Sequence, residues 1–88
     1  MELEVKKRKN QEQYQIKIKN DVVYPNKILI IKIGISEEDF YRILNRNNVQ
    51  YTYDSKGKKY SYFSIEKEAQ KTIDEIFGLL TMRKIMGE

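Results

Sequence analysis

The sequence contains no cysteine and no histidine. Their absence excludes disulfides, the usual zinc ligand sets, thiol nucleophiles and histidine acid-base pairs, and with them most of the chemistry of small enzymes. The longest apolar run, Ile28 to Ile31, is far shorter than the roughly 20 residues of a membrane-spanning helix, and no signal-like stretch follows Met1. We therefore expect a cytoplasmic, non-enzymatic protein with no metal, no cofactor and no membrane contact.

The chain of 88 residues has room for a single domain, residues 1–88, because a chain of this size buries only about 60 to 65% of its unfolded surface. Its 17 Lys and Arg residues outnumber its 13 Asp and Glu residues, which gives a net charge of +4. The first 32 residues hold eight basic and four acidic side chains, and the remainder holds nine of each. This excess favours contact with nucleic-acid phosphates or with an acidic protein surface.

The N-terminal segment alternates between apolar and polar side chains on both sides of Lys9 to Glu12. This period predicts two half-buried strands joined by a loop. In the resulting register Val5 lies opposite Ile16, and Glu4 lies opposite Lys17. A slip by one residue would place glutamates against isoleucines, so both faces favour the same pairing.

The remaining segments predict the order βββαββα and an α+β fold. Residues 27–33 are apolar on both faces, as in a strand at the centre of a sheet. Ser36 is placed to cap a helix, residues 49–53 and 59–63 form two strands, and a last helix follows Ser64. We expect an antiparallel or mixed sheet of up to five strands with two helices mainly on one face.

The turn between the last two strands decides where the tyrosines of this hairpin point. A type I turn with a left-handed Gly57 pairs Tyr51 with Ser61, which places Tyr60 and Tyr62 on the outer face. A two-residue turn would require a positive φ at lysine and would put all four tyrosines on one packed face. The first register is favoured. The alternative for the tyrosines is that helices cover both faces of the hairpin, so that all of them are core or rim residues with their hydroxyls in water.

An exposed tyrosine pair beside lysines offers base stacking together with phosphate attraction, the combination used by proteins that bind single-stranded nucleic acid. We therefore predict a nucleic-acid-binding protein, for DNA or RNA. The alternative for the basic segments is that they are solvated loops that protect strand edges. The predicted contact residues are Lys6, Lys7, Arg8, Lys9, Lys56, Lys58, Lys59, Tyr60 and Tyr62.

The C-terminal segment carries a second apolar face. Leu79, Met82 and Met86 are rotated away from the helical stripe Ile65 to Leu80, and Gly78 lies at the change. This face favours a protein-binding inhibitor or adaptor that uses its C-terminal helix and a strand edge, or a homodimer through that helix. Alternatively, Gly78 kinks or ends the helix and the tail folds back on its own core.

Three resemblances accompany these patterns. The composition is similar to that of small phage and mobile-element proteins, which include anti-CRISPR-type inhibitors of host nucleases. Gly57-Lys58 followed by residues 63–69 resembles the hairpin and helix of the DNA-binding modules of tyrosine integrases, which implies DNA contacts from Lys58, Tyr60 or Tyr62.

The third resemblance is to GIY-YIG nucleases and rests on residues 14–16, residues 32–36 and a helix arginine, Arg42. It maps the catalytic set only onto Tyr14 and Arg42. Lys32 replaces the second tyrosine, and no metal-binding glutamate can be assigned, so a degenerate nuclease is the third alternative. Glu68 and Glu75 lie seven residues apart and share a helix face, which leaves a magnesium site as a further alternative.

Overall fold

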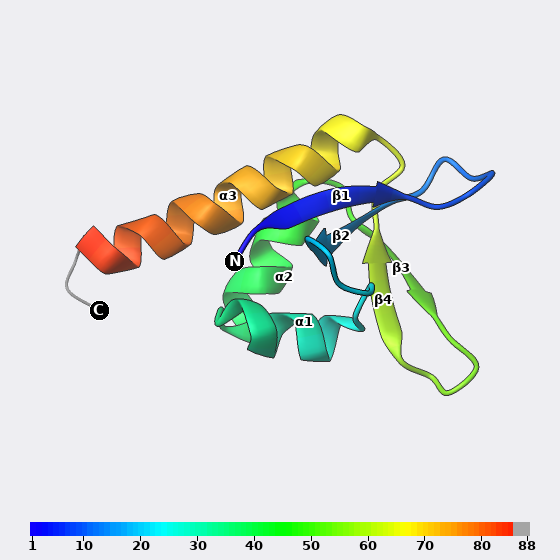
Figure 1. Cartoon of the computed structure of the whole chain (residues 1–88), viewed down its shortest axis with the longest axis horizontal. Coiled ribbons are helices and arrows are strands. Elements are labelled where there is room, and N and C mark those ends of the chain that lie inside the picture. Colours follow the sequence, from blue (N-terminus) through cyan, green and yellow to red (C-terminus); the bar gives the residue numbers. More distant parts are fainter. Residues whose placement is uncertain (86–88) are drawn as a thin grey trace.

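The computed structural model describes residues 1–85, which form two β-hairpins and three α-helices (Figure 1). The order is ββααββα, so the predicted order was wrong at its third element. The elements are β1 (Leu3–Lys7), β2 (Tyr14–Ile18), α1 (Asn26–Ile33), α2 (Glu37–Arg46), β3 (Gln50–Tyr53), β4 (Lys59–Tyr62) and α3 (Glu66–Ile85).

The first hairpin has the predicted register. Val5 pairs with Ile16, and Glu4 pairs with Lys17. The Lys17 Nζ atom lies 2.7 Å from a carboxylate oxygen of Glu4, and the Lys17 residue is only 8% exposed. Apolar pairs on one face and an ion pair on the other therefore stabilise the same alignment.

The predicted central strand at residues 27–33 was wrong, because this segment forms α1. Pro25 precedes the first helical residue, and Gly34 follows the last one with a left-handed φ of 82°. Leu29 and Ile33 are buried one helical turn apart. A continuous apolar run fits a buried strand or a helix equally well, so its periodicity gave no answer. The proline and the glycine at its two ends were the helix signal.

The helix α3 packs against the first hairpin and against α2. The Ser36 hydroxyl accepts a hydrogen bond of 3.1 Å from the amide of Asp39, which confirms the predicted cap of α2. Phe40 of α2 and Ile76 of α3 are almost completely buried. The third helix, α1, packs against α2 and β4, so the prediction of two helices lacked one element.

The second hairpin also has the predicted register, with Tyr51 opposite Ser61. Gly57 has a φ of 79° in its turn. Beyond the paired strands, Tyr14 and Phe63 exchange two backbone hydrogen bonds of 2.8 Å each, which join β2 to the end of β4. Residues 1–85 thus contain two two-stranded antiparallel sheets connected by one bridge, and not a five-stranded sheet.

Candidate nucleic-acid interface

The tips of the two hairpins lie at the same end of the molecule (Figure 1). The tip between β1 and β2 and the tip between β3 and β4 both point away from the C-terminal end of α3. The sequence could not reveal this relationship, because it depends on how the hairpins are joined. The bridge between Tyr14 and Phe63 sets the directions of the two hairpins. The two basic segments predicted to bind nucleic acid, residues 6–9 and 56–59, therefore lie at the same end of the molecule.

The first tip is ordered by its own side chains. The backbone amide of Arg8 donates to the carbonyl of Gln13 at 2.8 Å, and the Arg8 guanidinium donates to the Gln13 side chain at 2.9 Å. Lys7 lies 3.4 Å from Glu12. The hydroxyl of Tyr14 and the ammonium of Lys7 lower the pKa of the Glu12 carboxyl. Glu12 therefore stays ionised and offsets part of the charge of this tip.

The second tip is built around Asp54. Its Oδ1 atom accepts hydrogen bonds from the backbone amides of Lys56 and Lys58, at 2.8 and 2.9 Å. These amide donors, with that of Lys58 first, lower the pKa of the Asp54 carboxyl. The carboxylate is thus used to hold the turn, and the exposed side chains of Lys56 and Lys58 extend from it.

A hollow of about 260 Å³ lies between the two hairpins. Arg8 contributes to it from the first tip, and Tyr60 contributes from β4. Lys6 pairs with Gln15 in the first hairpin, and Gln15 also lines this hollow. The remaining lining residues are Val23, Thr52, Tyr53 and Asp54. Arg8 of the first tip and Tyr60 of the other hairpin therefore line a common concave surface.

Tyr60 and Tyr62 are partly buried, and not the exposed pair that the sequence predicted. The physical reason is the bridge between Tyr14 and Phe63, because it places β2 beside β4 and lets the first hairpin cover part of that strand. On this hairpin Tyr53 is 62% exposed, at the lip of the hollow. The predicted pairing of this hairpin placed the Tyr53 ring on the core face. Tyr53 was therefore not among the predicted contact residues.

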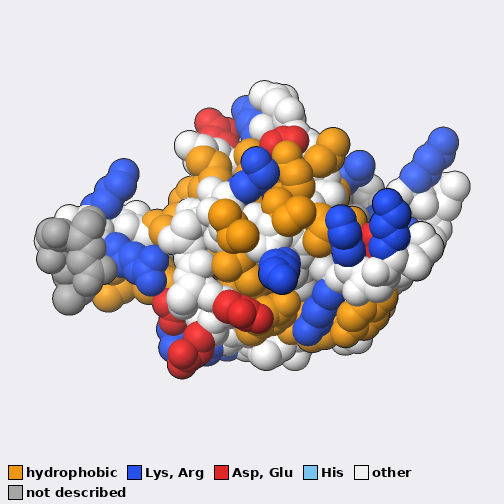
Figure 2. Space-filling view, turned by 90° about the horizontal axis from the view of Figure 1, so that it is seen from below, with side chains coloured by type: hydrophobic (Ala, Val, Ile, Leu, Met, Phe, Trp, Pro, Cys, Tyr) orange, Lys and Arg blue, Asp and Glu red, His pale blue; other side chains and the backbone are white. Residues whose placement is uncertain are grey.

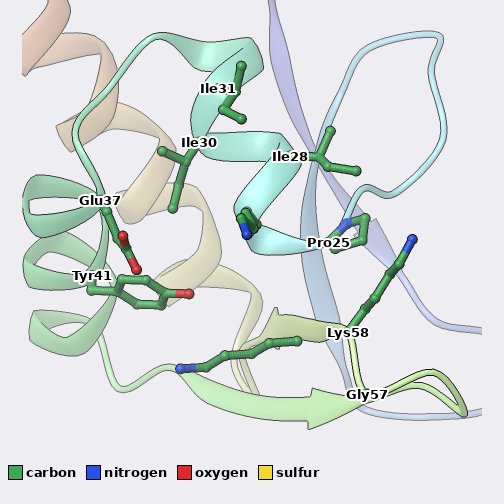
Figure 3. Close-up of a pocket in the computed structure, with 10 residues that line it drawn as sticks. Pro25, Ile28, Ile30, Ile31, Glu37, Tyr41, Gly57 and Lys58 are labelled. Carbon is green, nitrogen blue, oxygen red and sulfur yellow. The ribbon is translucent and has the colours of Figure 1, made fainter.

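Lys58 and Lys59 line a second depression, a groove of about 750 Å³ between α1, α2 and the β3–β4 hairpin (Figure 3). The Lys59 Nζ atom lies 4.1 Å from the ring centroid of Tyr51 and 4.7 Å from that of Tyr41. Successive residues of a strand point to opposite faces, so Lys59 and Tyr60 lie on opposite sides of the hairpin. The predicted contact residues therefore belong to two surfaces.

Ion pairs occur in both halves of the molecule, three of them within the first hairpin. Near α2 and α3, Arg42 and Arg83 pair with Asp39, and Arg46 pairs with Glu75. At the hairpin end and on α1, several cations form no ion pair with another residue of the described chain. These cations are Lys6, Arg8, Lys9, Lys27, Lys32, Lys56, Lys58 and Lys59, and on α3 the same holds for Lys67 and Lys71. Figure 2 shows Lys and Arg side chains among hydrophobic ones on the lower face, which carries α1.

The predicted C-terminal face is only partly assembled. The helix α3 continues through Gly78, so the alternative in which this glycine ends the helix was wrong. Leu79 is partly buried against the core, whereas Met82 is 59% exposed and Ile85 is 79% exposed. Met86 lies outside the described residues. The exposed apolar surface of this helix therefore consists of Met82 and Ile85 in its last turns and does not include Leu79.

The structure supplies no nuclease centre from the residues that the GIY-YIG resemblance selects. Residues 32–36 are the end of α1 and a connection, and not the second strand that the resemblance requires. The hydroxyl of Tyr14 donates to Glu12 at 3.0 Å, and Arg42 is bonded to Asp39.

The two carboxylates considered for magnesium have other partners. Glu68 accepts from Asn48, and Glu75 accepts from Asn47 and Arg46. Within residues 1–85 no group of three or more acidic side chains is close enough to hold a metal ion.

Comparisons with known proteins yield no relative: no family model, no curated protein and no solved structure matches the chain. The two family resemblances in the sequence therefore find no support there. None of the helices in residues 1–85 has the length and apolar character required to cross a membrane.

Proposed function

We propose that this protein binds single-stranded nucleic acid, DNA or RNA, at the end formed by its two hairpin tips, and that it catalyses no reaction there. The observation that carries the proposal is that Arg8 and Tyr60, from different hairpins, line one hollow. A guanidinium binds phosphate oxygens, and an aromatic ring stacks on an unpaired base. The two groups together match the two halves of a nucleotide.

Charge around the hollow supports the same ligand. Lys6 lies in register with Gln15, which lines the hollow, and Lys9 and Lys56 lie at the two tips. None of these lysines forms an ion pair with another described residue. Their charge therefore attracts phosphates, and counterions released from the strand add to the affinity.

The shape of the site favours a single strand over a duplex. The hollow has a volume of about 260 Å³, and Tyr53, which is 62% exposed, is among the residues that line it. An unpaired base can turn out of its strand and stack on such a ring, whereas bases in a duplex are already stacked on each other. We therefore expect the duplex to bind only through its phosphates.

Fluorescence anisotropy with end-labelled oligonucleotides tests the proposal. Single-stranded DNA or RNA should bind more tightly than a duplex of the same length at physiological salt. The slope of log affinity against log salt should be about −2 to −3, as expected for three or four phosphate contacts on a single strand. If neither single-stranded nor duplex DNA or RNA binds at physiological salt, the proposed function is wrong.

Charge reversal locates the site. The double variant Arg8→Glu, Lys9→Glu should lower affinity by about tenfold or more at physiological salt. Lys67→Glu, Lys71→Glu makes the same change in net charge on the exposed surface of α3 and is the matched control. An equal loss in both variants would show that only net charge matters and that the hollow is not the site.

Aromatic substitution separates stacking from charge. Tyr53 is 62% exposed, so Tyr53→Ala should leave the fold intact. It should weaken single-strand binding by about 1 to 3 kcal/mol if a base stacks on the ring. Duplex binding should change much less, and an equal effect on both ligands would contradict the stacking contact.

A further inference from the structure

The groove on the other side of the β3–β4 hairpin has a volume of about 750 Å³. Figure 3 shows α1 along one side, with Ile28 and Ile31 on it, and the hairpin with Lys58 on the opposite side. Tyr41 of α2 reaches into the space between them. The groove is therefore an apolar wall and a cationic wall that face each other.

The apolar wall is the outer face of α1. Leu29 and Ile33 occupy the inner face of this helix and are buried in the core. Ile28 and Ile31 lie one turn apart on the outer face and are 37% and 73% exposed. Lys27 and Lys32 share the exposed side of α1 with these isoleucines, and no other element of residues 1–85 covers Ile31.

Most of the charge lies on the opposite wall, with Lys58 and Lys59, whereas Lys27 belongs to α1 itself. Lys58 and Lys27 line the groove, and neither forms an ion pair with another described residue. The ammonium of Lys59 is held over the rings of Tyr41 and Tyr51, at 4.7 and 4.1 Å. Glu37 is the one carboxylate among the residues that line this groove. The groove therefore has a net positive charge beside exposed isoleucines.

We propose that this groove binds an amphipathic helix of a partner protein, with its apolar side chains on Ile28 and Ile31 and its acidic side chains toward Lys58 and Lys27. In helix-in-groove recognition the bound helix inserts apolar side chains into an apolar groove, and Ile28 and Ile31 provide the apolar lining that these side chains would contact. Charge complementarity selects an acidic helix over a basic one. The aliphatic wall also favours protein over nucleic acid, because isoleucine side chains offer no flat ring for base stacking.

This inference is independent of nucleic-acid binding, because the hollow and the groove lie on opposite sides of the same hairpin. The hollow depends on Arg8 and Tyr60, whereas the groove depends on Ile31 and Lys58. Variants of one surface should leave binding at the other unchanged, so the two proposals can fail separately.

The test uses a fluorescein-labelled designed helix of about 18 residues, with leucines on one face and glutamates and alanines elsewhere. Two comparison peptides carry lysine in place of glutamate, or the same residues in scrambled order. The acidic amphipathic helix should bind the full chain at least ten times more tightly than either comparison peptide in anisotropy at physiological salt. No binding of the acidic helix at millimolar protein would overturn the proposal.

Two variants, Ile31→Asp and Lys58→Glu, and one control, Val22→Asp, locate the bound helix. Ile31→Asp changes an exposed side chain and should reduce binding at least tenfold. Val22→Asp makes the same kind of change at another exposed apolar residue, 63% exposed and outside the groove, and should have no effect. Lys58→Glu should reverse the preference, so that the lysine peptide binds more tightly than the glutamate peptide. An unchanged order of affinities in Lys58→Glu would overturn the charge match.

Two other occupants of the groove are outcomes of the same test. If unlabelled single-stranded DNA displaces the helix from the protein, and Arg8→Glu, Lys9→Glu does not prevent it, the groove binds nucleic acid. If sedimentation shows a dimer that Ile31→Asp dissociates, a second copy of the chain covers the isoleucines. Either result would overturn the proposal.

Discussion

Tyr14 and Phe63 exchange two backbone hydrogen bonds of 2.8 Å each, and this pair joins the two hairpins. The Phe63 side chain is fully buried, so the bridge is supported by the core beneath it. Because the bridge aligns β2 with β4, it sets the position of Arg8 relative to Tyr60. The hollow between the hairpins exists because of this connection.

We predict that Phe63→Ala lowers the free energy of unfolding by about 3 to 5 kcal/mol, because it removes a large buried ring and leaves a cavity. Urea unfolding followed by circular dichroism measures the loss. Tyr53→Ala, at an exposed ring of the same hairpin, should stay within about 0.5 kcal/mol of the unmodified protein. A loss below about 1 kcal/mol for Phe63→Ala would show that the ring does not hold the hairpins together.

Two glycines should respond to alanine with opposite signs. Gly34 ends α1 with a φ of 82°, a conformation that costs an L-residue about 1 to 2 kcal/mol, so Gly34→Ala should destabilise the protein. Gly78 lies within α3 with open space at its Cβ position, and Gly78→Ala should add about 0.5 to 1 kcal/mol of stability. Thermal unfolding compares the two, and a stabilised Gly34→Ala would contradict the helix end at this position.

Stability at acid pH should depend on Glu75. Burial alone would raise the pKa of this carboxyl, but hydrogen bonds from Asn47 and Arg46 and the charge of Arg46 outweigh it and lower the pKa below the ordinary value of 4.5. A lowered folded-state pKa means that the stabilisation is complete above the ordinary value. It is lost as the pH falls through the lower folded-state value.

Glu75→Gln should therefore be less stable than the unmodified protein at neutral pH, by less than about 1 kcal/mol, because the Arg46 side chain of the ion pair is 54% exposed. The difference should shrink as the pH falls below 4.5. Chemical unfolding at a series of pH values gives both curves. Parallel curves down to the acid limit would show that the carboxylate contributes no pH dependence.

The turn between β3 and β4 should require an acceptor at position 54. Asp54→Ala removes the oxygen that accepts from the amides of Lys56 and Lys58, so exchange of the Lys58 amide with solvent should accelerate. Asp54→Asn retains a side-chain carbonyl and should protect that amide nearly as well. Hydrogen exchange followed by NMR reads both amides, and equal protection in all three proteins would show that backbone contacts alone hold the turn.

Sequence patterns predicted the local structure correctly where they were compatible with a single arrangement. The alternation around Val5 and Ile16 allowed one register in which both faces are satisfied, and Ser36 with its acidic neighbours allowed one helix start. A local rule failed at residues 27–33, because a run of isoleucines carries no period that separates strand from helix. The helix ends at Pro25 and Gly34 contained the missing information.

By itself the sequence determined the two hairpin registers, the cap of α2 and the excess of positive charge, because these depend on neighbours in the chain or on composition. The tertiary structure alone decided that Lys59 and Arg8 lie on different surfaces and that Ile31 faces solvent. The physical reason is that a single bridge between Tyr14 and Phe63 orients the hairpins, and no local pattern encodes a contact between residues so distant in the chain.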